Sequence, residues 1–224
     1  MKLARPDIFH PRIVLAGSGG DADDAGLLPA LRRRGLHARW LPWDDPRTRD
    51  AHLVILRDAP DRAGRLDEFR AWTVSVANLL NPPDAVVWNL GERYLDDLAV
   101  AGVPTGQGGG SEMALVFLAA EPSHAFAGAR PLEPDFAVWD LGRAALAAAA
   151  DRLGGAAENL LCARVDVRGD RVSGLDLVAP PLGWRLLDDA ARDLGQRRFA
   201  LAVESACERL GLGPLSRRDA QRGP

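Results

Sequence analysis

Two aspartates and an arginine lie on a stretch of chain that is otherwise mostly apolar. Arg164 and Asp166 belong to the segment 160–167, and Asp176 belongs to the segment 172–178. Both segments have the apolar, valine- and leucine-rich composition of strands, and a short glycine-containing turn separates them, so we predict a β-hairpin. Arg164 and Asp166 are two positions apart and therefore share one face of the first strand.

Carboxylates on such an apolar scaffold are costly unless they pair with a cation or hold a metal ion. Two interpretations are open. In the first, Asp166 and Asp176 bind a divalent cation. In the second, each carboxylate forms an ion pair with an arginine of the hairpin, and the candidates are Arg164, Arg168 and Arg171. The residue types alone favour neither interpretation.

The composition indicates a soluble globular protein of one large or two small domains, because 47% of its 224 residues are hydrophobic and 26% are charged. The net charge of −3 gives no electrostatic case for binding nucleic acid or an anionic membrane. No apolar run approaches the ~18 residues that a membrane span needs, and the first residues lack a signal-peptide core. Cys162 and Cys207 lie in apolar surroundings, so we expect buried free thiols and a cytoplasmic location.

Arginine supplies almost all of the positive charge, because Lys2 is the only lysine among the 28 basic residues. Together with the frequent alanine and glycine, this usage indicates a bacterial genome rich in G and C. A site in this chain that needs a cation must therefore use arginine, which is not equivalent to lysine in geometry.

The first hundred residues alternate between short apolar runs and amphipathic stretches. This alternation predicts an open, mainly parallel α/β domain over residues 1–104. We predict strands at 12–16, 37–41, 52–56 and 86–87, and helices at 24–34, 66–80 and 91–101.

A glycine-rich loop after the first predicted strand has two interpretations. Gly17, Gly19 and Ala22 have the spacing of a dinucleotide-binding fingerprint. However, the three aspartates of residues 21–24 crowd the start of the next helix, where they would repel a pyrophosphate. Their position suits helix capping instead, so we expect an aspartate cap and no dinucleotide.

The second half changes from alternating units to consecutive strands, which predicts a separate α+β domain over residues 112–212. Residues 105–111 are glycine-rich and are predicted to form a flexible connector. We predict strands at 112–118 and 124–126 before the hairpin, helices at 141–153 and 188–210 on either side of it, and a flexible tail at 213–224.

Several phrases resemble ATP-grasp proteins, and they occur in the same order. They are VVWNLGERYLDDLAVAGVP at 86–104, SEMALVFL at 111–118, SHAF at 123–126, ARVD at 163–166 and LVAPPL at 177–182. The chain is most similar to the branch that resembles cycloserine-pathway and ribosomal-protein-modifying ligases. The resemblance implies a pre-ATP-grasp-like N-terminal domain followed by an ATP-grasp-like domain.

The resemblance also implies where ATP and Mg²⁺ would bind. In the family, carboxylates on the two hairpin strands hold Mg²⁺ against the phosphates of ATP, which makes Asp166 and Asp176 the metal-ligand candidates. Glu112 and His124 match cofactor-binding positions, and Arg164 is the candidate catalytic residue.

Important parts of the family pattern are changed in this chain. Gly174 and Ala179 stand at positions where the family has acidic residues, and Ala137 stands where an arginine would face phosphates or substrate. Only residues 106–111 fill the interval in which the family has a central subdomain that clamps ATP and supplies lysines. Phosphoryl transfer depends on positioning and charge neutralisation, and little of that machinery remains.

We therefore expect a degenerate ATP-grasp homologue without ligase activity, which acts as a binding or partner protein and binds ATP and Mg²⁺ weakly or not at all. One alternative is an active ATP- and Mg²⁺-dependent carboxylate–amine ligase, either alone or completed by another chain. A second alternative is an unrelated α/β binding protein. The expected partner is another protein or a second copy of this chain, with no nucleic acid and no membrane.

Overall fold

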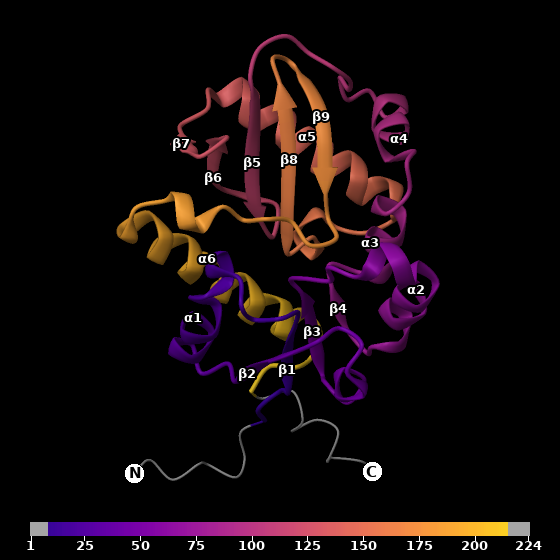
Figure 1. Ribbon diagram of the computed structural model, residues 1–224, viewed down its shortest axis with the longest axis vertical. Helices are drawn as coiled ribbons and strands as arrows, with labels where there is room; N and C mark the ends of the chain where they lie inside the picture. Colours follow the sequence, from indigo (N-terminus) through magenta and orange to yellow (C-terminus); the bar gives the residue numbers. More distant parts are fainter. Residues whose placement is uncertain (1–8, 215–224) are drawn as a thin grey trace, which may run out of the picture.

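The computed structural model describes residues 9–214, which form two β-sheets, one above the other in Figure 1. The lower sheet is parallel with the strand order β2-β1-β3-β4, and the upper sheet is antiparallel with the order β7-β6-β5-β8-β9. The strands are β1 (Ile13–Ala16), β2 (Ala38–Leu41), β3 (Leu53–Leu56), β4 (Leu79–Leu80), β5 (Glu112–Leu118), β6 (Glu121–Ala127), β7 (Arg130–Leu132), β8 (Cys162–Arg168) and β9 (Arg171–Asp176). The predicted fold class is confirmed.

Helices pack on both sheets. The α-helices are α1 (Leu27–Arg33), α2 (Leu66–Ser75), α3 (Pro83–Asn89), α4 (Tyr94–Val100), α5 (Phe136–Arg152) and α6 (Asp189–Arg209). Short 3₁₀ helices are η1 (Ala22–Asp24), η2 (Pro46–Thr48), η3 (Arg62–Arg65), η4 (Ala157–Asn159) and η5 (Trp184–Leu186). None of the described helices is long and apolar enough to span a membrane.

The central strands β1 and β3 are buried along their whole length, as their continuous apolar sequences predict for a parallel sheet. On one face, Leu31 of α1 packs with Ile13 and Leu15 of β1. On the other face, Phe69 of α2 packs with Val14. Alternate residues of β1 therefore enter two different cores.

The helix predicted at 66–80 is too long. It ends at Ser75, and Leu79–Leu80 form β4, which pairs in parallel with β3. The backbone N–H of Val54 donates a hydrogen bond to the carbonyl oxygen of Asn78 at 2.8 Å. This long-range pairing at the sheet edge outweighs the local helical pattern, which cannot report it.

Two further expectations differ from the structure. The strand predicted at 86–87 is wrong, because these residues lie inside α3, which begins at Pro83 with a proline geometry suited to a helix start. The helix predicted at 141–153 begins earlier, at Phe136. Both errors come from reading short apolar segments, for which strand and helix patterns are difficult to distinguish.

Helix α5 lies behind the antiparallel sheet in Figure 1, on the face opposite to the core that this sheet shares with the parallel sheet. Leu146 and Ala149 of α5 share a core with Leu115 and Phe117 of β5. Gly142 allows the close approach, because a Cβ at this position would lie 2.7 Å from the Cζ atom of Phe117. Small residues on this face of α5, among them Gly142 and Ala149, therefore permit close packing of the helix on the sheet.

The C-terminal helix α6 joins the two halves. It crosses from the antiparallel sheet to α1 and the parallel sheet (Figure 1), and the predicted helix at 188–210 is confirmed. Phe199 and Val203 of α6 share one core with Leu15 of β1 and Val116 of β5. The division into units 1–104 and 112–212 remains a prediction, and most of the predicted tail lies outside the described residues.

The connector between the halves crosses the tip of the β8–β9 hairpin. Thr105 forms a single bridge with Val172 of β9, and no helix or strand occurs between residues 106 and 111, all of which the structure describes. A Cβ at Gly108 would lie 1.8 Å from the carbonyl oxygen of Arg168. The glycine at position 108 is therefore needed for contact with the hairpin, and the predicted flexibility of the connector remains a prediction.

Candidate functional site

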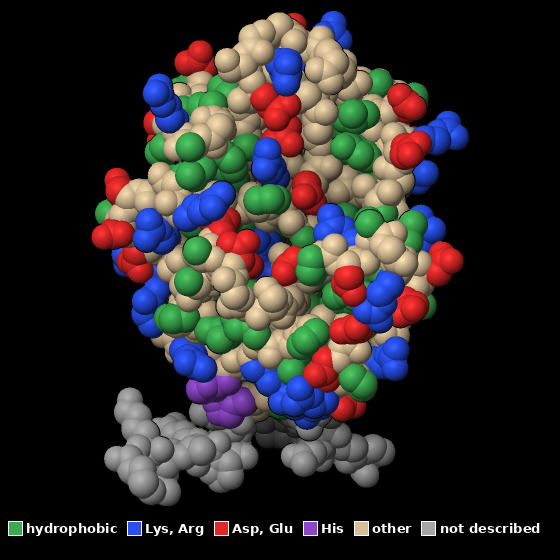
Figure 2. Space-filling view, viewed as in Figure 1, with side chains coloured by type: hydrophobic (Ala, Val, Ile, Leu, Met, Phe, Trp, Pro, Cys, Tyr) green, Lys and Arg blue, Asp and Glu red, His purple; other side chains and the backbone are tan. Residues whose placement is uncertain are grey.

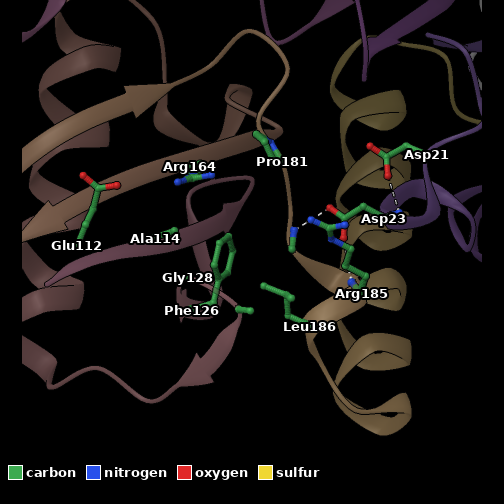
Figure 3. Close-up of a pocket in the computed structure, with 12 residues that line it drawn as sticks. Asp21, Asp23, Glu112, Ala114, Phe126, Gly128, Arg164, Pro181, Arg185 and Leu186 are labelled. Carbon is green, nitrogen blue, oxygen red and sulfur yellow. Dashed lines mark hydrogen bonds between the residues drawn. The ribbon is translucent and has the colours of Figure 1, made fainter.

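A cavity of ≈ 460 Å³ lies between the two halves. Figure 2 shows acidic and basic side chains around the hollow in the middle of this face, and Figure 3 shows two walls. Glu112, Arg164 and Phe126 lie on strands of the antiparallel sheet, and Asp23 and Arg185 lie on the opposite wall. The cavity is further lined by Asp21, Ala114, Gly128, Ala129, Pro181, Gly183 and Leu186.

The sheet register brings the hairpin residues together. Arg164 of β8 lies opposite Asp176 of β9, and Asp166 lies opposite Gly174. On its other side, Asp166 lies opposite Ala114 of β5. The sequence prediction that Arg164 and Asp166 share a strand face is supported by their direct contact, in which the Arg164 Nε–H donates to Asp166 Oδ1 at 2.7 Å.

Each of the two aspartates already has partners within the protein. Asp166 pairs with Arg164, and both side chains are about one-fifth exposed, at 22% and 23%. Burial raises the pKa of Asp166, and the neighbouring Arg164 guanidinium opposes this shift only partly. Asp176 Oδ1 accepts hydrogen bonds from the backbone N–H groups of Val178 (2.9 Å) and Ala179 (3.2 Å).

The metal assignment to Asp166 and Asp176 remains a prediction. Among residues 9–214, there is no group of three His, Cys, Asp or Glu side chains arranged to hold a metal ion. Gly174 adds no donor, and a Cβ there would lie 3.2 Å from Asp166 Oδ2. Ala179 contributes a backbone N–H to Asp176 rather than a carboxylate.

Glu112 and His124 are separated by the structure. Glu112 lines the cavity and accepts long hydrogen bonds from Arg168 (3.3 Å) and Ser173 (3.4 Å). His124 does not line this cavity, and its Nε2 atom contacts the carbonyl oxygen of Leu182. Their assignment as cofactor-binding residues remains a prediction.

The acidic loop performs more than the expected capping. Asp21 caps η1 by accepting a hydrogen bond from the Asp23 N–H at 2.8 Å. The aspartate cap predicted for the helix at 24–34 is therefore found on the short helix that precedes α1, and α1 itself begins after Gly26 without a side-chain cap. Asp23 instead accepts hydrogen bonds from the backbone N–H groups of Gly183 (2.7 Å) and Arg185 (2.9 Å). It thereby fixes one wall of the cavity to the parallel-sheet half.

Arg185 is a cavity residue that sequence reasoning missed. Its backbone is held by Asp23, whereas its side chain makes no hydrogen bond or ion pair with any residue that the structure describes. The sequence offered no signal for it, because Arg185 lies beyond the family phrase and reaches the cavity only through the fold of residues 179–187.

A buried ion pair of the parallel-sheet half also holds the segment 179–187 in place. Arg57, which follows β3, contacts Asp24 at 3.1 Å and donates a hydrogen bond to the Pro180 carbonyl oxygen at 3.0 Å. Burial raises the pKa of the Asp24 carboxyl, although Arg57 lies beside it. Burial also raises the pKa of the free thiol of Cys162 to about 11, so this cysteine is not activated as a nucleophile.

Asp166→Asn is expected to gain stability relative to the wild type as the pH rises. The pKa of Asp166 is raised in the folded protein above its usual 3.8, so this group stabilises the fold fully below pH 3.8 and loses that contribution as the pH rises through its folded pKa. Asparagine does not titrate. Urea unfolding of both proteins between pH 4 and pH 7 measures the difference.

The control for this prediction is Asp140→Asn. Asp140 also pairs with an arginine at 2.7 Å, but its side chain is 70% exposed on α5. Because this ion pair is exposed, we expect Asp140→Asn to change the free energy of unfolding by ~0.5 kcal/mol or less. The difference in unfolding free energy between Asp166→Asn and the wild type should change with pH. If it stays constant between pH 4 and pH 7, or shifts in favour of the wild type as the pH rises, the charge of Asp166 is not poorly compensated.

The comparisons with known proteins agree with this architecture. Residues 9–81 match the family model described as the N-terminal domain of D-cycloserine synthetase DcsG. The crystal structure of D-cycloserine synthetase DcsG is 23% identical with a TM-score of 0.72, and the match covers 89% of this chain and 99% of that chain. No curated protein matches the sequence.

Two further solved structures are similar. The ATP-grasp ligase PsnB, complexed with precursor peptide PsnA2 and AMPPNP, is 13% identical with a TM-score of 0.59 over 90% of this chain and 100% of that chain. The macrocyclase MdnB from Microcystis aeruginosa MRC is 12% identical with a TM-score of 0.59 over 86% of this chain and 98% of that chain.

These likenesses confirm the resemblance stated from the sequence. The chain has the fold of ATP-grasp ligases. Its N-terminal part resembles in particular the first domain of D-cycloserine synthetase, as residues 9–81 match that domain's family model.

Proposed function

We propose that this chain is an ATP-grasp homologue that has lost ligase activity and serves as a binding or partner protein. The observation that carries the proposal is the commitment of both aspartates to groups of the protein itself. Asp166 pairs with Arg164, and Asp176 accepts two backbone N–H groups. Mg²⁺ prefers an octahedron of oxygen ligands, and this donor set does not fit such a site.

The connector provides independent support. Residues 106–111 form no strand or helix and follow the hairpin tip, where Gly108 contacts the Arg168 backbone. ATP that carries one Mg²⁺ still has about two negative charges, which a site must match with cations and backbone donors. A connector of this length, without lysine, offers neither a cover nor a cation for the phosphates.

The arginines that line the cavity would neutralise the phosphates of ATP only in part. Arg164 is already neutralised by Asp166, and Arg185 stands near the carboxylates of Asp21 and Asp23. The balance of charge in the cavity therefore does not favour a triphosphate. Loose binding of Mg²⁺, with most of its water retained, is the most that the carboxylates would support.

The second candidate is an active carboxylate–amine ligase that another chain completes. It is favoured by the persistence of a cavity of ≈ 460 Å³ with an uncommitted guanidinium at Arg185. The similar ligase PsnB has been solved with a precursor peptide, Mg and nucleotide. In this form of the proposal, the partner supplies the cations and the cover that the connector lacks.

In either form, we propose that the chain acts in the cytoplasm with a protein or peptide partner, or with a second copy of itself. Titration of ATP into the full chain, with and without Mg²⁺, tests the loss of the nucleotide site. We expect weak or undetectable binding and no ADP formation in the presence of candidate carboxylates and amines.

A further inference from the structure

A β-bulge places Ser123 next to His124. Val116 of β5 lies opposite His124 of β6, whereas the next residue, Phe117, lies opposite Pro122. Ser123 is therefore the extra residue of the bulge. Successive side chains of a regular strand point to opposite faces, and a bulge re-aims one of them. The Ser123 Oγ atom consequently lies 3.0 Å from Nδ1 of its neighbour His124.

The second ring nitrogen of His124 determines the direction of this hydrogen bond. His124 Nε2 lies 2.5 Å from the carbonyl oxygen of Leu182, which can only accept. The proton of the neutral ring therefore resides on Nε2, and Nδ1 presents a lone pair to the hydroxyl of Ser123. A nucleophile, a base and a group that orients the base are thus in hydrogen-bond contact, which is the arrangement that activates serine.

Ser123 and His124 open onto a cavity of ≈ 700 Å³ that differs from the candidate nucleotide site. It lies between β6, β7 and the first half of α6, and its apolar lining includes Leu132, Leu187 and Leu194. Leu194 is 47% exposed although it belongs to this wall. A cavity of this size and composition suits a small apolar group.

Arg198 supplies positive charge beside the serine. Its Nη1 atom lies 3.4 Å from the Pro122 carbonyl oxygen and 3.5 Å from that of Ser123, distances at the limit of hydrogen bonding. Arg198 has no ion pair with a carboxylate among the described residues. Its guanidinium is therefore available to an oxygen that gains negative charge near Ser123 Oγ.

We propose that Ser123 and His124 form a nucleophile–base pair that hydrolyses esters with short apolar acyl groups. This activity is separate from the proposed function, because it uses the other cavity and neither Asp166 nor Asp176. The family resemblance assigns no such reaction to the SHAF phrase in this chain.

The reaction balances with water as the only co-reactant. Ser123 Oγ forms a bond to the ester carbonyl carbon while its proton moves to His124 Nδ1, and the carbonyl oxygen becomes an oxyanion near Arg198. Collapse breaks the bond to the alkoxy group, which leaves as an alcohol with the proton from His124. Water then attacks the acyl-serine, gives a proton to His124 and releases the carboxylic acid, and the proton returns to Ser123.

The surroundings of His124 keep the ring neutral, as a base requires. Burial lowers the pKa of His124, and Arg198 of α6 acts in the same direction, whereas Asp23 and the Leu182 carbonyl oppose the shift. Glu133 and Asp188 also line the cavity, and Asp188 is occupied in capping α6.

Hydrolysis of p-nitrophenyl butyrate by the full chain tests this inference, together with labelling by diisopropyl fluorophosphate. We expect hydrolysis above the buffer rate and a single label on the Ser123 peptide. Ser123→Ala should lose at least ~100-fold in rate and should not be labelled. His124→Gln should lose a similar factor, and its amide N–H can still donate to Leu182.

Ser205→Ala is the matched control, because Ser205 lies on α6 outside this cavity. It should keep the wild-type rate and the label. Circular dichroism shows whether Ser123→Ala remains folded. A wild-type rate equal to that of Ser123→Ala, or a label on a residue other than Ser123, would overturn the inference. Both outcomes would leave the nucleotide-binding experiment unaffected.

Discussion

Replacing Arg57 with methionine is expected to lower the free energy of unfolding by about 3–5 kcal/mol. Arg57 is 5% exposed, its partner Asp24 is also 5% exposed, and the two are in contact at 3.1 Å. The substitution leaves the Asp24 carboxylate buried without its cation and also removes the hydrogen bond to Pro180. Removal of one partner from a buried pair costs more than the pair itself contributes.

Urea unfolding of Arg57→Met measures this cost, with Arg143→Met as the control. Arg143 pairs with Asp140 on the surface of α5, and we expect a change of ~0.5 kcal/mol or less there. The double substitution Arg57→Met with Asp24→Leu should recover much of the loss, because no charge then remains buried. A loss below ~1 kcal/mol for Arg57→Met alone would show that the pair is not the anchor described above.

Phe199→Ala is expected to cost about 3–5 kcal/mol because a fully buried aromatic ring is removed. Phe199 lies on α6, where its ring meets that of Trp184 edge to face at 6.0 Å between centroids. The cavity would open in the core that both sheets share, so both halves should lose stability together.

Thermal or urea unfolding followed by two probes, one in each half, checks this expectation. Leu201→Ala is the matched control, because Leu201 lies two residues further on the same helix and is 49% exposed. It should cost well under 1 kcal/mol. If Phe199→Ala unfolds only one half, or costs no more than Leu201→Ala, α6 is not the element that joins the halves.

The fold could be predicted from the sequence where a strand has a clear local pattern of its own. The buried strands β1 and β3 and the hairpin of β8 and β9 were predicted because their local patterns coincide with their burial. Leu79–Leu80 were assigned to a helix because two residues carry too little pattern, and only pairing with β3 makes them a strand.

The candidate site was only partly predictable for a similar physical reason. The Arg164–Asp166 pair is local, because its members are two positions apart, and strand geometry makes such a pair foreseeable. The contact of Asp23 with Gly183 spans 160 positions, and no spacing rule reports it. The Ser123 contact depends on a bulge, whose position follows from pairing with β5 rather than from the sequence of β6.

Calorimetric titration of ATP into the wild type and Asp166→Asn, each with and without Mg²⁺, tests the loss of the nucleotide site most directly. Asp166 is paired with Arg164, and the phosphate-binding cations are absent from the connector, so there is little nucleotide affinity to lose. We expect weak or undetectable binding in all four titrations and no effect of the substitution. Micromolar binding that requires Mg²⁺ and disappears in Asp166→Asn would contradict this account and would show a working, shortened ATP-grasp site.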